Sequence, residues 1–284
     1  AEAGEIVALS GLEEVNIGDT IADPTNPVAL PRVTIDEPTV QMTFSVNNSP
    51  FAGRDGKYLT SRHLRERLFK ELETNVSLRV QETDSADRFL VAGRGELHLG
   101  VLIEQMRREG YELQISQPEV ILHREGDTVT EPFEELTIQV PSEYQGPVIE
   151  EIGKRRGELR HMKLVHSEGT ASEMHIEYHI PTRGIIGLKN ILLAKTRGTI
   201  ILHHVFSGYA PADEKALLVA PHGSLVAFEA GTSTAYALFM TQERGELFIG
   251  ASVEVYQGMV VGQNSRDEDL DVNVCKQKQL SNMR

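Results

Sequence analysis

The chain has 284 residues, of which 40% are hydrophobic and 25% are charged, and its formal net charge is −14. This composition is typical of a globular protein of about two domains, and it excludes a disordered, collagen-like or coiled-coil chain. The single cysteine, Cys275, excludes an internal disulfide framework and suits a reducing cytoplasm. No apolar run approaches the roughly 20 residues of a membrane span, and no secretory signal is recognisable, so we expect neither.

Basic residues gather in four stretches of this acidic chain. Residues 54–70 hold six bases against two acids, and residues 153–163 hold five against one. Residues 183–204 and residues 276–284 hold bases and no acid. The net charge argues against a protein that coats DNA, because a phosphate polymer would be repelled at long range. Local basic stretches favour contact with a polyanion at chosen points, although Lys and Arg on solvated helix faces would give the same pattern.

The first 36 residues are predicted to be the remnant of a domain followed by a linker. Short strands are expected at Glu5–Leu9 and Thr20–Ala22, with turn residues between them. Prolines at positions 24, 27 and 31 then indicate an extended connection. These few residues are too short to form a core of their own.

Residues 37–120 carry the pattern of a ferredoxin-like domain. A strand is expected at Val40–Val46, because apolar and polar residues alternate there. Thr60 or Ser61 can cap a helix whose apolar stripe is Leu64, Leu68 and Leu72. Strands follow at 77–81 and 88–91, then a helix that ends at Gly110, then a strand at 112–115. This β-α-β-β-α-β order is the split βαβ unit.

Residues 121–210 repeat the same order with a different sequence. The expected strands are 134–140, 159–166, 172–180 and 199–206. Ser142 and Gln145 form a capping-box signature for the first helix, and Gly157 is its expected end. A second helix is expected over 184–197.

Residues 211–284 predict a third domain of short strands and glycine turns. Strands are expected at 224–230, 235–240, 246–249 and 252–256, and no helix is expected. The predicted fold class is therefore α+β, with two ferredoxin-like (βαββαβ) domains in series followed by a β-rich C-terminal domain.

Motifs for catalysis and nucleotide binding are missing from the sequence. Neither Gly-Lys pair has the upstream glycine and following Ser or Thr of a phosphate-binding loop, and no nucleophile motif occurs. His175, Glu177 and His179 share one face of a predicted strand and could hold a metal ion. A polar sheet face against water, RNA or another domain is the favoured interpretation, and His203 and His204 should point to opposite faces. We expect no enzyme activity, cofactor or metal in this chain.

Several segments together resemble a known family. Residues 3–23 look like the end of the β-barrel domain of elongation-factor-type GTPases, and residues 93–120 are similar to their third domain. Three further segments, NNSPFAGRDGKYLTSRHLRERL (47–68), EYHIPTRGIIGLKN (177–190) and NVCKQKQLSNMR (273–284), resemble the BipA/TypA family of translational GTPases. The resemblance covers essentially the whole chain and matches the C-terminal part of that family, which lacks the GTPase domain.

The resemblance implies a cytoplasmic, monomeric factor that binds the 70S ribosome, contacts large-subunit rRNA and tRNA, and serves large-subunit assembly and stress or cold adaptation. GTP and Mg would bind in the absent GTPase domain. Residues 37–120 and 121–210 would be the family's third and fifth domains, residues 1–36 the end of its barrel domain, and residues 211–284 its own C-terminal domain. Lys276, Lys278 and Arg284 fall in the match to its RNA-contacting loop. A regulatory protein that senses a small ligand between paired ferredoxin-like domains is the alternative.

Overall fold

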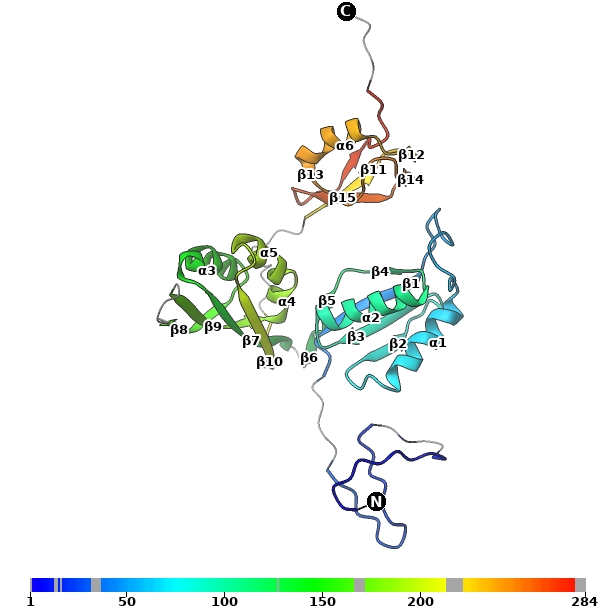
Figure 1. Ribbon diagram of the computed structural model, residues 1–284, viewed down its shortest axis with the longest axis vertical. Coiled ribbons are helices and arrows are strands. Elements are labelled where there is room, and N and C mark those ends of the chain that lie inside the picture. Colours follow the sequence, from blue (N-terminus) through cyan, green and yellow to red (C-terminus); the bar gives the residue numbers. More distant parts are fainter. Residues whose placement is uncertain are drawn as a thin grey trace, which may run out of the picture. The chain divides into compact units, whose positions relative to one another are not determined.

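A computed structural model describes residues 2–12, 15, 17–31, 37–126, 128–165, 172–212 and 222–278 (Figure 1). The chain forms two compact units, Ala1–Glu214 and Lys215–Arg284. Both are mixed α/β structures whose sheets are mainly antiparallel. Among the described residues, no helix has the length and apolar character needed to span a membrane.

The described residues before position 32 contain no strand, so the two short strands predicted there are wrong. Ile6, Val7 and Leu9 are all exposed to solvent. An apolar segment becomes a strand only when a neighbouring strand satisfies its backbone groups, and none of the described residues supplies one.

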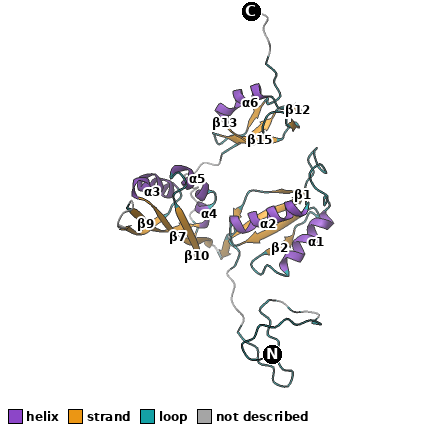
Figure 2. Ribbon diagram, viewed as in Figure 1, coloured by secondary structure: helices purple, strands orange, loops and turns teal. Residues whose placement is uncertain are grey.

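The first sheet has the strand order β2-β3-β1-β4, with the short strand β5 beside one end of β1. Every pairing in it is antiparallel. Helices α1 and α2 pack on one face (Figure 2). The side chains on the opposite face are partly or fully exposed, and we call it the open face. The order and topology of the expected β-α-β-β-α-β unit are present. Its elements are β1 (Val40–Val46), α1 (Ser61–Leu72), β2 (Arg79–Glu82), β3 (Arg88–Gly93), α2 (Glu96–Glu109), β4 (Leu113–Ile115) and β5 (Glu119–Val120).

Local chemistry explains where the two helices of this sheet begin and end. Thr60 is the N-cap of α1, and its hydroxyl accepts a hydrogen bond of 3.3 Å from the amide of His63. Gly110 ends α2 in the left-handed conformation, with φ of 96°. Leu64 and Leu68 of the predicted stripe are buried, and Leu72 is partly buried against the same core.

The carboxylate of Glu112 holds the long loop between β1 and α1. Its oxygens accept hydrogen bonds from the backbone amides of Gly53 (2.9 Å), Asp55 (3.1 Å) and Gly56 (3.0 Å), and from the Asn47 side chain (2.5 Å). Partial burial raises the pKa of Glu112, but these hydrogen bonds outweigh it, and the net shift is downward. A Cβ at Gly56 would lie 2.6 Å from the Cβ of Glu112, so the loop needs glycine there.

The second sheet has the order β10-β7-β9-β8, with β6 beside β7. This is the same antiparallel arrangement as in the first sheet, with helices α3 and α5 packed on one face (Figure 1). The repeated unit is thus present. Its elements are β6 (His123–Glu125), β7 (Thr128–Pro141), α3 (Gln145–Lys154), β8 (Glu158–Val165), β9 (Glu173–Pro181), α4 (Thr182–Ile185), α5 (Leu188–Lys195) and β10 (Ile201–Pro211).

Two helix predictions in this unit need correction. Ser142 does not cap α3, because it begins a short 3-10 turn (Ser142–Tyr144) and Tyr144 is the N-cap, with no side-chain hydrogen bond. The single helix expected over 184–197 is two helices, since Gly187 has φ of 70° and separates α4 from α5. A glycine adopts this left-handed conformation without the strain of a side chain.

A buried arginine fills the break between α4 and α5. Arg155 Nη1 donates to the carbonyl oxygens of Gly184 and Ile186, both at 2.9 Å, while its Nε lies 3.2 Å from Glu151. Lys195 donates to the other oxygen of Glu151 at 2.7 Å. The carbonyls released by the helix break are therefore bonded by a side chain instead of water.

The second unit is built on the sheet β13-β15-β11-β16 and the short pair β12-β14. The strand predicted at 235–240 is wrong, because these residues form helix α6 (Ala235–Thr241) with Thr234 as its N-cap. Strands β15 and β16 lie after residue 256, where the last predicted strand ends. The strands are β11 (Ser224–Ala227), β12 (Gly231–Thr232), β13 (Gly245–Leu247), β14 (Glu254–Val255), β15 (Val260–Asn264) and β16 (Leu270–Val272).

Candidate nucleic-acid interface

In the basic stretch at 54–70, three arginines form ion pairs within the first sheet domain, whereas Lys57 and Lys70 are exposed and form none with the described residues. Arg62 pairs with Glu66 at 2.8 Å, one helical turn away, and Arg65 pairs with Glu82 of β2 at 2.5 Å. Exposed pairs of this kind are weak, but each removes a free positive charge from the surface. These arginines would have to exchange a carboxylate partner for a polyanion, so polyanion binding by this stretch stays a prediction.

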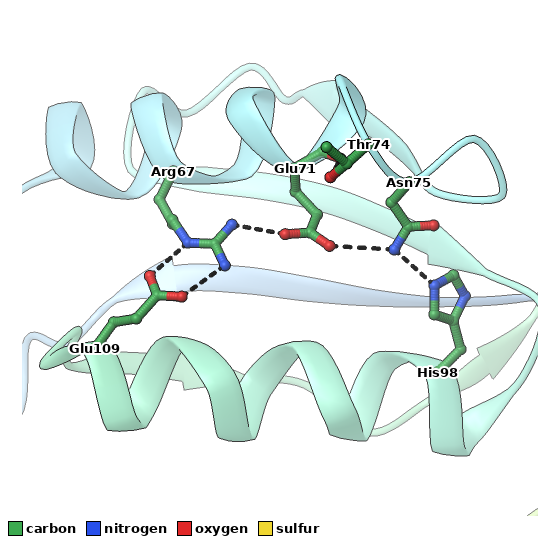
Figure 3. Close-up of polar contacts among 6 residues, drawn as sticks. All are labelled: Arg67, Glu71, Thr74, Asn75, His98 and Glu109. Carbon is green, nitrogen blue, oxygen red and sulfur yellow. Dashed lines mark hydrogen bonds and ion pairs between the residues drawn. The ribbon is translucent and has the colours of Figure 1, made fainter. Parts of the chain in front are cut away.

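Arg67 is the most firmly held of these arginines (Figure 3). Its guanidinium donates two hydrogen bonds to Glu109 of α2, at 2.6 and 2.8 Å, and a third to Glu71 at 2.8 Å. The other oxygen of Glu71 accepts from Asn75, whose amide nitrogen lies 2.9 Å from His98 Nε2. Glu109 first, and then Glu71, raise the pKa of Arg67, while burial lowers the pKa of His98. This network ties α1 to α2.

An open hollow of about 510 Å³ lies beside this network. Its wall has more carboxylates than basic groups, so it is not suited to phosphate. The lining residues are Glu66, Arg67, Lys70, Glu71, Glu73, Thr74, Glu109 and Tyr111.

The stretch at 153–163 is also largely neutralised. Lys154 pairs with Glu150 at 2.6 Å, and Arg155 is buried against Glu151 as described above. Burial would raise the pKa of Glu151, but the hydrogen bonds from Lys195 and Arg155 lower it below its usual value. Lys163, on β8, is exposed and makes no ion pair within the described residues.

In the acid-free stretch at 183–204, some basic side chains are paired within the described residues and others are not. Arg183 forms a two-pronged pair with Glu131 of β7, at 2.7 and 3.0 Å, and Glu131 is only 2% exposed. Such an arginine serves the fold and is not available to a ligand. Lys189 and Arg197 are exposed and have no ion pair among the residues that the structure describes.

Lys276 and Lys278 follow the last strand of the second unit, and both side chains are exposed. The backbone carbonyl of Lys276 accepts a hydrogen bond of 2.6 Å from Thr234, the residue that caps α6. The chain just before it is held by Val274, which is buried and whose carbonyl accepts from the amide of Thr234 at 2.9 Å. Neither lysine pairs with a carboxylate of the described chain. Arg284, the third predicted RNA-binding residue, lies outside the described residues.

His175, Glu177 and His179 do share the open face of the second sheet, because Met174, Ile176 and the other alternate residues of β9 are buried. Their partners lie on the same face. His179 Nδ1 is 2.9 Å from Glu135, and its ring stacks on Phe133 with 4.8 Å between ring centres. In the part of the chain that the structure describes, no three metal-ligating side chains are placed to hold a metal ion.

His203 and His204 point to opposite faces of β10, as predicted, since their partners are Thr137 and the buried Leu136. His204 Nδ1 forms a short hydrogen bond with Glu134. This bond raises the pKa of His204, although burial and the charge of Lys189 act in the opposite direction.

Sequence reasoning missed two arginines of the first sheet. Arg79 on β2 and Arg88 on β3 alternate with partly or fully buried residues, Val80 and Phe89, so they project from the open face. Both are exposed, and neither forms an ion pair with the described residues. The strand alternation could have located them, but neither lies within a run of basic residues.

The sequence of the chain is similar to known proteins and to the models of two protein families. Residues 222–284 match the model of the TypA/BipA C-terminal domain, and residues 128–218 match the elongation factor G C-terminus. A large ribosomal subunit assembly factor BipA of Synechocystis is 48% identical over 100% of this chain and 47% of its own length. One from Bacillus subtilis is 47% identical over 100% of the chain and 46% of its own length. A chloroplastic TypA-like protein of Arabidopsis thaliana is 50% identical over 100% of the chain and 41% of its own length. The chain thus spans less than half the length of these relatives.

Proposed function

This chain belongs to the TypA/BipA family and matches its C-terminal part, and we propose that it is the ribosome-binding part of a translational GTPase that acts in large-subunit assembly. The names of the bacterial relatives support the link to the large subunit. GTP and Mg would bind in a domain outside this chain, and this part would engage the ribosome without catalysing a reaction itself. We assign it to the cytoplasm as a monomer.

The domain assignment forms part of the same proposal. Residues 37–120 would act as the third domain of the family and residues 121–210 as its fifth, with residues 1–36 as the end of the barrel domain. The match of residues 128–218 to the elongation factor G C-terminus supports the second of these assignments. Residues 211–284 would then be the family-specific domain that reaches RNA.

The observation that carries the proposal is the pair of exposed lysines after β16. Lys276 sits on backbone that is held to α6, and Lys278 follows two residues later. Basic side chains without an internal partner can neutralise rRNA or tRNA phosphates and release bound counterions. Paired arginines such as Arg62 would first have to break an ion pair.

A ribosome-binding titration tests the proposal. The 284-residue chain is mixed with 70S ribosomes at rising KCl, and the bound fraction is measured by pelleting. We expect binding that weakens steeply with salt. The double variant Lys276→Ala/Lys278→Ala should bind more weakly and lower the slope of log K against log salt by about two units.

The matched control is Arg62→Ala/Lys154→Ala, which removes the same charge from two paired and exposed positions. It should bind like the unaltered chain. No pelleting of the unaltered chain at low salt would contradict ribosome binding. An unchanged slope in the lysine variant would contradict a phosphate contact at these residues.

A further inference from the structure

The open face of the first sheet presents its side chains in three rows across the strands. Arg88 pairs with Ser45, and Ser45 pairs with Gln114, so these three lie abreast. The next row holds Gln81, Leu90 and Thr43. The third row consists of Arg79, Ala92, Gln41 and Glu119. We call this surface the Arg88 face.

A shallow hollow of about 500 Å³ lies at the Arg88 end of this face. Among the described residues that line it, Arg88 is the only charged one. The hydroxyls of Thr43, Ser45 and Ser116 and the amide of Gln114 surround it. Ser116 already donates to the carbonyl oxygen of Gln117 at 2.9 Å and Gln114 to Asn47 at 3.2 Å, so the Ser116 hydroxyl would exchange an internal hydrogen bond for one to a ligand. Arginine, hydroxyl and amide side chains are the groups that proteins use to contact nucleic-acid phosphates. Ile115 completes the lining.

The charges of the Arg88 face differ from those of the helices on the other side of the same sheet. On α1 and α2, Arg62, Arg67 and Arg108 all pair with glutamates. On the open face, neither Arg79 nor Arg88 has such a partner among the described residues. Glu119 is the one carboxylate in the three rows, and it lies at the far end of the row from Arg79.

The spacing of the two arginines indicates the size of the ligand. They lie on neighbouring strands and two rows apart, which places their Cα atoms about 14 Å from one another by ordinary strand geometry. One phosphate ion cannot span that distance, but a polymer of phosphates can. The three rows also hold no aromatic side chain on which an unpaired base could stack.

We propose that the Arg88 face binds the phosphate backbone of double-helical RNA, without reading its sequence. This inference deepens the proposed ribosome binding and rests on it. RNA is preferred over a protein partner, because protein interfaces are centred on apolar and aromatic anchors, whereas the middle of this face holds Gln81, Leu90 and Thr43. The Arg88 face lies in a different unit from Lys276 and Lys278. The face and the two lysines would therefore make separate contributions to the salt dependence of binding.

The test compares two double variants of the 284-residue chain. Arg79→Gln/Arg88→Gln removes the unpaired charges, and Arg62→Gln/Arg108→Gln removes the same charge from exposed, paired positions of α1 and α2. Binding to 70S ribosomes, and separately to a synthetic 20-base-pair RNA duplex, is measured at several KCl concentrations. Thermal unfolding of each variant confirms that the fold is kept.

We expect the Arg79/Arg88 variant to bind both probes about tenfold more weakly at low salt and to lower the salt slope by about two units. The control should stay within about twofold of the unaltered chain, because its charges are already neutralised. Equal behaviour of the two variants on both probes would overturn the proposal for this face, and ribosome binding itself would still stand. The Arg79/Arg88 variant could also bind ribosomes more weakly while its salt slope and its duplex binding stay unchanged. That result would assign the face to a ribosomal protein and would overturn the proposal of RNA binding as well. Failure of the unaltered chain to bind ribosomes contradicts the proposed function, and the duplex measurement then decides on the face alone.

Discussion

The two ferredoxin-like sheets share one topology but distribute their charges differently. In the first, arginines on the helices pair with glutamates at the surface, and the unpaired Arg79 and Arg88 project from the open face. In the second, Arg155 is buried beneath the helices, and the open face carries histidines that lie beside glutamates. The comparison teaches that a repeated fold does not repeat its surface charges, since polar positions outside the core are free to differ.

The difference also shows where free positive charge is found in this chain. Arg62 and Arg67 each have a glutamate four residues later on the same helix, and Arg155, which caps the end of α3, has one four residues earlier. Such residues face each other on a helix and pair readily. The unpaired cations Arg88 and Lys276 lie instead on a strand or after one, although Lys189 of α5 is also exposed without an ion pair among the described residues. A helix rich in bases and acids is therefore a poor indicator of a polyanion site.

The two sheet domains should differ most in how much stability they lose when a charged side chain is changed, because among the described residues only the second has a buried charged group beside its helices. Glu151→Gln would leave Arg155 and Lys195 without their shared carboxylate in a buried site. We expect the free energy of unfolding to fall by about 3 kcal/mol or more, because breaking a buried pair leaves an uncompensated charge. Urea unfolding of the chain measures it. The neighbouring Glu150→Gln, at an exposed position, should leave the midpoint unchanged, and a similar loss in both variants would contradict this account.

In the first sheet domain, the carboxylate of Glu112 holds the loop between β1 and α1 through hydrogen bonds to its backbone. Glu112→Gln keeps the shape of the side chain but removes its charge, which weakens three backbone hydrogen bonds. We expect hydrogen exchange at Gly53, Asp55 and Gly56 to become about fivefold faster, since one net hydrogen bond is worth about 1 kcal/mol. Amide exchange followed by NMR or mass spectrometry checks this. Unchanged exchange in the loop, with the rest of the domain also unchanged, would show that the carboxylate is not needed there.

A smaller contribution to stability, from His204 in the second sheet, should depend on pH. The hydrogen bond to Glu134 raises the pKa of His204, so the protonated histidine stabilises the fold. This contribution is complete below the unfolded value and is lost as the pH rises through the higher folded value. Between about pH 6 and pH 9 the melting temperature of the unaltered chain should fall more than that of His204→Gln. Parallel pH profiles would contradict the assignment.

The smallest effect is expected at the surface pair of α1. Arg62→Ala removes one partner of an ion pair whose side chains are both well exposed. Its melting temperature should match that of the unaltered chain in high salt, where surface pairs are screened. A marked loss of stability of the variant at 1 M salt would contradict this prediction. It would mean that the Arg62–Glu66 pair stabilises the fold as a buried pair does.

Elements with strong periodicity were predictable from the sequence alone. Strand β1 and helices α1 and α2 follow from alternating or helical apolar spacing and from caps at Thr60 and Gly110. Helix α6 was predicted as a strand, because six residues of mixed apolar sequence fit either structure and only the cap at Thr234 distinguishes them. The strands expected before residue 32 failed for a different reason, since a strand depends on a partner elsewhere.

The candidate site was predictable only in part. The positions of Lys276 and Lys278 at the surface could be anticipated from an acid-free polar segment. Pairs within one helix, such as Arg62 with Glu66, could have been anticipated from their spacing. Pairs such as Arg183 with Glu131 depend on tertiary contacts between residues far apart in the chain, which no local pattern reveals.

The central claim is that the unpaired cations Arg79, Arg88, Lys276 and Lys278 bind RNA, whereas arginines that are already paired on the helices do not. The most direct measurement is the salt slope of 70S binding for two fourfold variants of equal charge. Neutralising Arg79, Arg88, Lys276 and Lys278 to glutamine should lower the slope by about four units. Neutralising Arg62, Arg65, Arg107 and Arg108, all of which are paired, should leave it nearly unchanged. Equal slopes for the two variants would contradict the claim.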